Sequence, residues 1–285
     1  MFVIIGAVVV LLSILGGFAL EGGPFLVLMQ VAEFIIIGGA AAGALLISTP
    51  PRIMKKIVNR LIGSLKGNNK ITKETYLQLL ALLYELFNVI RKDGLVALEA
   101  HIERPQESAI FKKYPQFLSQ HEIMVFITDT FRLLVMGNVP THEIEQLLDA
   151  DIEMQHQEGM KPGMILQKIG DSMPGLGIVA AVLGIVITMQ AINGPPEEIG
   201  HKVAAALVGT FLGIFISYGF LQPLATNLDL ANDDESRIFE VIKSGIIATA
   251  KGLNPIAALE FARRVITDDY RPAFQEMENF VKGNK

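Results

Sequence analysis

Few residues in this 285-residue chain could do chemistry, and their spacing excludes most catalytic designs. The chain has no cysteine, so disulfides and thiol chemistry are excluded. The histidines lack the paired spacing of metal ligands, and a surface position is the more ordinary interpretation of each one. They are His101, His121, His142, His156 and His201. We therefore expect no metal centre, no cofactor and no enzymatic activity.

A glycine-rich segment, Gly175-x-Gly177-x-x-Ala180, loosely matches a dinucleotide-binding fingerprint. That fingerprint requires a preceding strand within a βαβ unit. No segment alternates apolar and polar residues as a strand would, and a long apolar run follows the glycines. A nucleotide site is therefore not expected. Nucleic acid is not an expected partner either, because no basic patch is interleaved with aromatic residues.

The same glycines belong to the stretch around which the chain is organised, a pair of apolar segments at 173–192 and 203–221. Each segment is long enough to cross a hydrocarbon layer of ~30 Å. Small residues recur in both at four-residue intervals, which places them on one helix face and favours close packing. The expected packing residues are Ala180, Gly184 and Thr188, followed by Ala205, Gly209, Gly213 and Ser217. Pro174 is expected to open the first helix, and Pro223 to end the second.

Two earlier apolar runs, Phe2–Leu20 and Phe25–Ile47, bring the number of predicted spanning helices to four. A cleaved signal peptide is the rival interpretation of the first run. We favour a retained helix, because no Lys or Arg precedes the run and a good cleavage site is lacking. The second run contains the pair Gly39-x-x-x-Gly43. The sequence thus predicts an all-α integral membrane protein with four transmembrane helices in two hairpins.

Basic residues after the second run indicate the orientation. Residues 48–73 contain no acid and seven basic residues, namely Arg52, Lys55, Lys56, Arg60, Lys66, Lys70 and Lys73. The linker at 21–24 has no basic residue, and residues 193–202 have only Lys202. The positive-inside rule therefore places both termini and the long polar block in the cytoplasm.

The polar block between the hairpins has the apolar periodicity of helices. A stripe from Glu74 to Lys92 predicts a helix that Thr72 caps and Gly94 ends. The next helices are expected from Leu95 to about Pro105, at His121–Met136 and from Thr141. In the tail, Asn254 and Pro255 predict a helix start. The expected domains are a transmembrane hairpin at 1–47, a large helical cytoplasmic domain at 48–170, a second hairpin at 171–226 and a helical C-terminal tail at 227–285.

Ionisable groups are scarce inside the predicted spans. The interiors of the last two spans have only hydroxyls, those of Thr188, Thr210 and Ser217, and no charged residue. Glu33 is expected near the outer end of the second span, where it can reach interfacial water; a role in an ion path is the alternative. Proton movement through lipid normally requires an ionisable relay. If the chain handles ions, we expect another polypeptide to supply the titrating group.

Several long segments resemble the signature segments of the flagellar motor stator family typified by MotA, in the MotA/TolQ/ExbB proton channel superfamily. The matching segments are Gly170–Ala181, Val208–Ile214, Tyr218–Thr226, Tyr76–Tyr84, Leu98-Glu99, Arg104–Ser108 and Glu260–Arg264. They run nearly end to end. Val31 departs from the pattern, because many relatives have proline before Ala-Glu; the departure puts in doubt a kink at this position.

The resemblance implies a stator subunit that forms a homopentamer around two copies of MotB in the bacterial inner membrane. MotB would supply the ion-binding aspartate, and ion flux would drive torque on the rotor protein FliG. Arg91 and Glu99 match rotor-facing charges of the family. Pro174 and Pro223 match prolines that couple ion flow to motion, and Thr210 matches a hydroxyl near the ion path. Membrane lipid is the remaining expected partner.

Other interpretations stay open at this point. An ExbB- or TolQ-type proton-driven energiser shares the ring plan but usually has three spans, and a non-conducting membrane scaffold would show no ion flux. Arg91 in a last helical turn is favourable merely by opposing the helix dipole. Glu99 could be a solvated acid, and Thr210 could bond to its own helix. Proton is our choice over sodium as the coupling ion.

Overall fold

The computed structural model describes residues 2–67 and 71–283, and all regular structure in these ranges is helical. Four helices are long and apolar enough to cross a membrane. The all-α class expected from the sequence is confirmed. The chain divides into two compact units, which we describe separately. The first unit comprises residues 1–69 and 159–231, and the second comprises residues 70–158 and 232–285.

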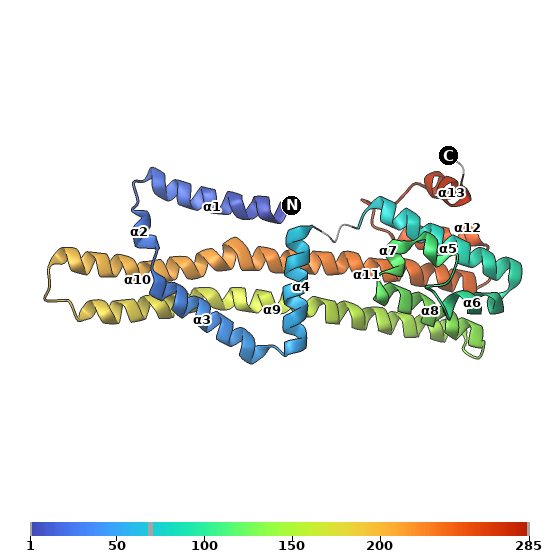
Figure 1. Cartoon of the computed structure of the whole chain (residues 1–285), viewed down its shortest axis with the longest axis horizontal. Helices are drawn as coiled ribbons and strands as arrows, with labels where there is room; N and C mark the ends of the chain where they lie inside the picture. Colours follow the sequence, from blue (N-terminus) through green and yellow to red (C-terminus); the bar gives the residue numbers. More distant parts are fainter. Residues whose placement is uncertain (1, 68–70, 284–285) are drawn as a thin grey trace. The chain divides into compact units, whose positions relative to one another are not determined.

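The first unit contains the apolar helices, whose labels and course are drawn in Figure 1. Its elements are α1 (Phe2–Leu20), α2 (Phe25–Leu28), α3 (Val31–Ser48), α4 (Pro51–Lys66), the second part of α9 (Thr141–Met189), α10 (Pro196–Ile216), the π-helical turn η3 (Ser217–Leu221) and the start of α11 (Gln222–Ala250). Helix α4 carries most of the basic cluster and buries Ile53 and Ile57. Lys70, also counted in that cluster, lies outside the described residues.

Both prolines of the second hairpin lie inside helical structure, which corrects the sequence prediction. Helix α9 continues for 49 residues, and Pro162 and Pro174 lie within it. Pro174 therefore opens no helix. Pro223 likewise ends none, since it is the second residue of α11, which extends to Ala250. Helical proline removes one backbone hydrogen bond, so each proline requires a local compensation.

The second apolar run is not one continuous helix, as the sequence had suggested. It is interrupted at Met29 and Gln30, whose ψ angles of 64° and 96° are not helical. The Gln30 side-chain amide donates to the Val27 carbonyl at 3.0 Å, which satisfies an acceptor at the end of α2. Helix α3 then starts at Val31. The break thus forms without a proline at residues 29–31.

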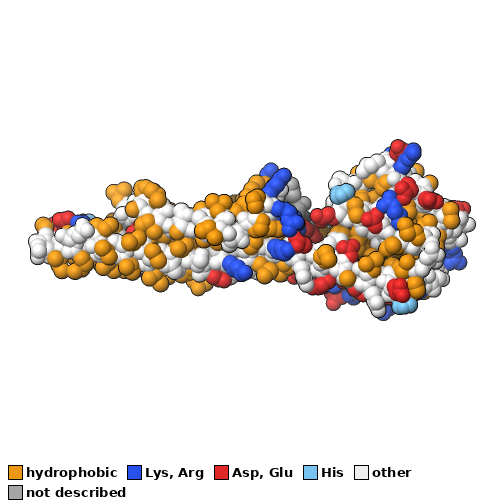
Figure 2. All heavy atoms as spheres, turned by 90° about the horizontal axis from the view of Figure 1, so that it is seen from below, with side chains coloured by type: hydrophobic (Ala, Val, Ile, Leu, Met, Phe, Trp, Pro, Cys, Tyr) orange, Lys and Arg blue, Asp and Glu red, His pale blue; other side chains and the backbone are white. Residues whose placement is uncertain are grey.

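Apolar side chains make up much of the surface of the first unit on the face that Figure 2 shows. On α9 the exposed apolar residues include Ile178, Val179, Val182 and Val186, all at least half exposed. In water such a surface would be costly, at about 25 cal/mol per Å². A helix surface of this kind suits lipid, which agrees with the four candidate spans.

The second unit has a core of large side chains. Its elements are α5 (Lys73–Asp93), the 3₁₀ turn η1 (Leu95–Leu98), α6 (Glu99–Ile102), the 3₁₀ turn η2 (Phe111–Lys113), α7 (Pro115–Leu118), α8 (His121–Met136), the first part of α9, the second part of α11, α12 (Pro255–Val265) and α13 (Phe274–Lys282). Thr72 caps α5 through Thr75 N, and Asn254 caps α12 through Ala257 N. These two caps and the bounds of α8 are as predicted. The single helix expected from Leu95 is instead η1 followed by α6.

The compact units do not follow the domain limits drawn from hydropathy. The predicted cytoplasmic domain begins at residue 48 and ends at 170, whereas the second unit takes only residues 70–158 of that range. Helix α4 and the α9 segment after residue 158 belong with the apolar helices. The difference arises because packing, not polarity, defines a compact unit. Where the membrane begins along these helices stays a prediction.

Candidate functional site

Helices α9 and α10 run antiparallel and touch through their backbones. A Cβ atom placed on Gly213 would lie 2.5 Å from the Met173 carbonyl oxygen and 3.0 Å from Gly177 Cα. A Cβ on Gly177 would lie 2.7 Å from the Gly209 carbonyl oxygen. Real side chains essentially never approach backbone so closely, so glycine is required on both helices at this crossing.

Ala180, Gly184 and Thr188 lie along the same face of α9, whereas on α10 the alanine that meets Gly184 is Ala206 and not the predicted Ala205, which is only partly buried. Ala180 is fully buried, and its Cβ would be 3.1 Å from a Cβ on Gly209. Gly184 faces Ala206, whose Cβ would be 2.8 Å from an added Cβ. Thr188, one turn further along α9, donates to the Gly184 carbonyl at 2.8 Å. The four-residue pattern therefore corresponds to one continuous face of α9.

Glu33 points into this small-residue contact, which corrects the expectation that its side chain reaches water. Its side chain is 6% exposed. Its Oε2 atom would lie 2.5 Å from a Cβ on Gly209, and Oε1 would lie 3.7 Å from a Cβ on Gly184. Oε2 is buried and has no hydrogen-bond partner among the described residues. The first unit therefore contains a buried carboxyl group.

A hydrogen bond between helices compensates for Pro174. Pro174 has no N–H, so the carbonyl of Gly170, four residues earlier, loses its helical donor. The Ser217 hydroxyl, which is fully buried, donates to this carbonyl at 2.6 Å. The Gln222 amide extends the link, reaching Asp171 Oδ1 at 2.9 Å and the Ser217 oxygen at 3.4 Å. Ser217, expected only as a packing residue, is thus the partner of the proline-freed carbonyl.

Pro223 follows a local change in helix type. Residues 217–221 form a π-helical turn, and the N–H of Gln222 donates to the Ser217 carbonyl five residues earlier. A π turn adds one residue to the helical repeat and accommodates the missing donor of a proline. Pro174 and Pro223 therefore lie on either side of one polar network, made of Gly170, Ser217 and Gln222 with Asp171.

Thr210 follows Gly209 on α10 and is half-buried. Its Cα would be 3.2 Å from a Cβ on Gly177. Thr188 bonds back to its own helix, but the Thr210 hydroxyl makes no such bond within the described part of the chain. The ordinary alternative for Thr210, a bond to its own backbone, is therefore not seen. Its hydroxyl is free to bind another group.

Arg91 and Glu99 are both exposed in the second unit. Arg91 lies in the last turn of α5, and Glu99 begins α6 after the turn at Gly94, whose φ is 84°. Neither side chain forms an ion pair or hydrogen bond with residues of the ranges 2–67 and 71–283. Elsewhere in this unit charged groups are paired, such as Arg132 with Glu103 at 2.7 Å. Arg91 and Glu99 are therefore two opposite charges that face solvent without a partner in the described ranges.

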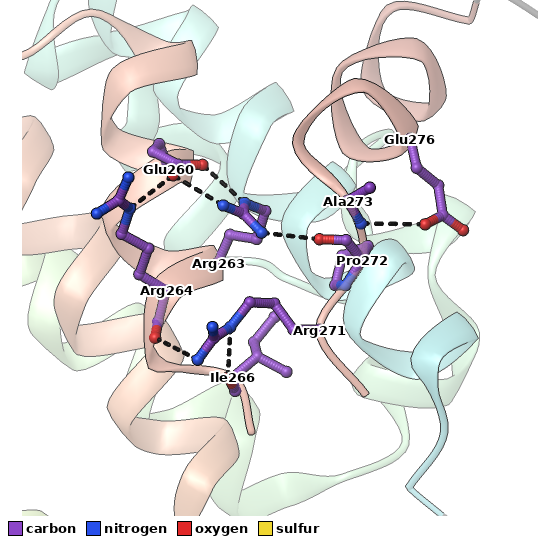
Figure 3. Close-up of polar contacts among 8 residues, drawn as sticks. All are labelled: Glu260, Arg263, Arg264, Ile266, Arg271, Pro272, Ala273 and Glu276. Carbon is purple, nitrogen blue, oxygen red and sulfur yellow. Dashed lines mark hydrogen bonds and ion pairs between the residues drawn. The ribbon is translucent and has the colours of Figure 1, made fainter. Parts of the chain in front are cut away.

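The Glu260–Arg264 segment that supported the family resemblance has a structural role (Figure 3). The Glu260 carboxylate accepts hydrogen bonds from Arg263 at 2.7 and 2.8 Å and from Arg264 at 2.7 Å. These bonds, from Arg263 first, lower the pKa of Glu260 to about 2, against an opposing effect of burial. Arg263 also donates to the Pro272 carbonyl at 2.9 Å. The segment thereby fixes the chain between α12 and α13.

Sequence analysis missed Asp171 and Gln222 as members of the proline network, and it missed the burial of Glu33. One signal was available, since the residue four before Pro174 is Gly170, whose carbonyl must find a donor. No local pattern shows which helix supplies that donor. No group of three or more His, Asp or Glu side chains could hold a metal ion in the described ranges.

Two family models cover most of the chain. Residues 4–94 match the model described as Motility protein A N-terminal, and residues 119–253 match the MotA/TolQ/ExbB proton channel family. Motility protein A of Salmonella typhimurium is 39% identical over 99% of this chain and 95% of its own length. The Motility protein A of Escherichia coli is 39% identical over 100% of this chain and 96% of its own.

Two solved structures share the fold. The structure of C. jejuni MotAB superposes with a TM-score of 0.77 and 24% identity, covering 95% of this chain and 98% of its own. The structure of the flagellar MotAB stator complex from Bacillus subtilis superposes with a TM-score of 0.75 and 24% identity. It also covers 95% of this chain and 98% of its own. Near-complete coverage by relatives at 39% identity settles the classification. The chain belongs to the Motility protein A family of the MotA/TolQ/ExbB proton channels.

Proposed function

We propose that the chain is a stator subunit of a bacterial flagellar motor, which conducts protons together with a MotB-type partner and drives torque on the rotor. The observation that carries this function is the end-to-end match to proteins named Motility protein A. It favours the stator over an ExbB- or TolQ-type energiser, which shares only the broader family. The free hydroxyl of Thr210, beside the tight helix contact, supports a place for the partner's acid.

The ion path is tested in lipid vesicles that contain the chain with its MotB-type partner. The chain alone is expected to conduct no protons, because the partner contributes an essential acid. Thr210→Ala should lower the flux of the complex, and Thr210→Ile should block it by overfilling the contact near Gly177. Thr226→Ala is the control, since that exposed hydroxyl bonds to the Gln222 carbonyl. Full flux in both Thr210 variants contradicts the assignment.

Arg91 and Glu99 are the proposed contacts to the rotor protein FliG. Exposed ion pairs are worth about 0.2–1 kcal/mol, so single neutralisations should slow swimming without abolishing it. Arg91→Glu should impair motility more strongly, because it replaces attraction by repulsion. Lys112→Glu is the matched control, an exposed cation in η2. Reversal of the facing charge on FliG should restore motility to Arg91→Glu; failure of every such reversal contradicts direct contact.

The proposed location is the bacterial inner membrane, with both termini cytoplasmic, in a pentamer around two MotB chains. Basic residues on α4 support this orientation. Single cysteines at Ser64, Asn138 and Asn193 can be treated with an impermeant maleimide on intact cells. Only position 193 should react. Labelling at position 64 or 138 contradicts the topology, and the mass of the purified complex tests the stoichiometry.

A further inference from the structure

The four apolar segments at 2–20, 25–47, 173–192 and 203–221 contain one carboxylate residue, Glu33. Its side chain is 94% buried, the complement of 6% exposure, and Oε2 has no hydrogen-bond partner in the described structure. An unpaired buried carboxyl group is costly, whether in protein or lipid. Ionisable residues inside membrane spans are rare and mark sites that bind ions, protons or substrates. The question is which ligand its surroundings admit.

The Glu33 carboxyl group lies against glycine and alanine positions of α9 and α10. Gly209 and Gly184 provide the space, and the Cβ atoms of Ala180 and Ala206 border it. A metal cation requires several oxygen ligands, which methyl groups do not offer, and the backbone carbonyls of α9 and α10 here accept helical hydrogen bonds. A proton requires one acceptor, which Glu33 supplies. The environment therefore fits a proton and not a metal ion.

No opposite charge neutralises Glu33 from the elements packed against it. Helix α2 has no charged residue, and α3 has no other. Helix α9 has none between Met173 and Met189. The charged or titratable residues of α10 all lie in its first two turns, at Glu197, Glu198, His201 and Lys202, where Lys202 pairs with Glu198 at 2.9 Å. A proton is thus the simplest means of neutralising this side chain.

We propose that Glu33 is a proton-binding site within the ion path, in addition to the acid of the partner; this inference rests on the proposed proton-conducting function. A proton from the outer side adds to the Glu33 carboxylate, giving the neutral acid. It then leaves to the next acceptor, a water molecule or the partner's acid beside Thr210, and the carboxylate is restored. The first-turn position in α3 lets the helix dipole stabilise that carboxylate between transfers.

Two structural features connect Glu33 with the entry side of the proton and with its next acceptor. On one side, the helix break at Met29 and Gln30 lies three to four residues before Glu33, where the backbone is not helical. Non-helical backbone at membrane depth occurs where protein or a water-filled cavity surrounds it. On the other side, Glu33 contacts the Gly209 position, which is followed directly by Thr210.

The test uses vesicles that contain the complex with the MotB-type partner, with proton flux measured over a range of outer pH. In Glu33→Gln, flux should fall by roughly 10²-fold, the effect of losing a proton-transfer group. Glu33→Asp should retain part of the flux with a changed pH dependence. Glu21→Gln, in the outer linker, is the control and should behave as wild type. Unchanged flux and pH dependence in Glu33→Gln overturn the proposal, whereas no flux from the wild-type complex contradicts the stator function itself.

A second measurement separates proton binding from a purely structural role. Dicyclohexylcarbodiimide reacts with neutral carboxylic acids: the O–H adds across a C=N bond, and the adduct rearranges to an N-acylurea without a leaving group. In the wild-type complex the peptide containing Glu33 should gain this mass, more at low than at high pH, while flux is lost. If Glu33→Gln fails to assemble, this labelling decides. An observed Glu33 peptide that remains unlabelled at every pH overturns the proposal.

Discussion

The two units are stabilised by opposite kinds of packing. In the first unit, α9 and α10 meet backbone to backbone, with glycine at 177, 209 and 213. In the second, fully buried Leu and Phe side chains such as Leu83 and Phe87 fill the core. Where backbones touch, there is little side chain to remove and no room to add one. Where large side chains meet, removal is costly and a small addition can be absorbed. The two units should therefore respond differently to the same substitutions.

The largest effect is expected in the second unit. Phe87→Ala removes a fully buried ring and should lower the free energy of unfolding by about 3–5 kcal/mol. Hydrogen exchange on the full chain, followed in peptides of α5 and α11, measures the loss. Phe274→Ala is the control, since that ring is 41% exposed. A cost below that of the control contradicts a side-chain-filled core.

The reverse change, which adds one methyl group to a glycine, should lower stability more in the first unit than in the second. Gly213→Ala brings a Cβ to 2.5 Å from the Met173 carbonyl, and overpacking of this kind costs about 1–3 kcal/mol. Gly245→Ala meets the edge of the Phe87 ring at 3.1 Å, which a side chain can relieve. Gly175→Ala meets nothing within 4 Å and serves as the control. Equal thermal stability of Gly213→Ala and Gly175→Ala in detergent contradicts the backbone contact.

The stability of the second unit should also depend on pH, because this unit contains a carboxylate whose pKa is strongly lowered. Glu260 has a pKa of about 2 in the folded chain and 4.5 ordinarily, so its stabilisation is present above about pH 4.5 and lost as pH falls toward 2. Allowing for its 21% exposure, Glu260→Gln should cost roughly 2 kcal/mol at neutral pH. The difference from wild type should shrink on acidification. Glu107→Gln, in an exposed 3.5 Å pair, is the control. A difference independent of pH contradicts the ion-pair account.

A smaller effect is expected at the proline network of the first unit. Ser217→Ala removes the donor to the Gly170 carbonyl and leaves that buried acceptor unsatisfied, at a cost of roughly 1–2 kcal/mol. Ser172→Ala is the matched control, because its hydroxyl bonds only to Ile169 in the same helix. Hydrogen exchange around residues 167–176 compares them. Similar exchange in the two variants would mean that Ser217 does not support the Pro174 segment.

Features fixed by local chemistry were predictable from the sequence. The caps of α5 and α12 follow from Thr72 and Asn254, whose side chains bond to the backbone three residues later. The four apolar helices follow from composition and length. The four-residue spacing of Ala180, Gly184 and Thr188 corresponds to one face of α9, because the period is a property of the helix itself.

Features that depend on a second helix were not predictable. Pro174 was expected to begin a helix, but Ser217 supplies the missing donor from another element, so α9 continues. Glu33 was expected to reach interfacial water. Only the fold shows that Gly184 and Gly209 leave space for its carboxyl group. At the break before Val31, the Gln30 side chain donates a hydrogen bond to the Val27 carbonyl. The composition of the segment does not predict this hydrogen bond.

The π-helical turn at Ser217–Leu221 also sets the rotational phase of the helix that follows. Residues four apart drift by about 40° per step in a regular α-helix, so Gly209 and Ala225 would face directions about 160° apart. A π turn takes up one extra residue, which removes about 100° of this rotation and leaves Gly209 and Ala225 about 60° apart. Both residues are in fact buried, and Ala225 packs with Leu166 of α9. The turn therefore acts as a phase correction, and deleting one residue from it would rotate the buried stripe of α11 toward the outside.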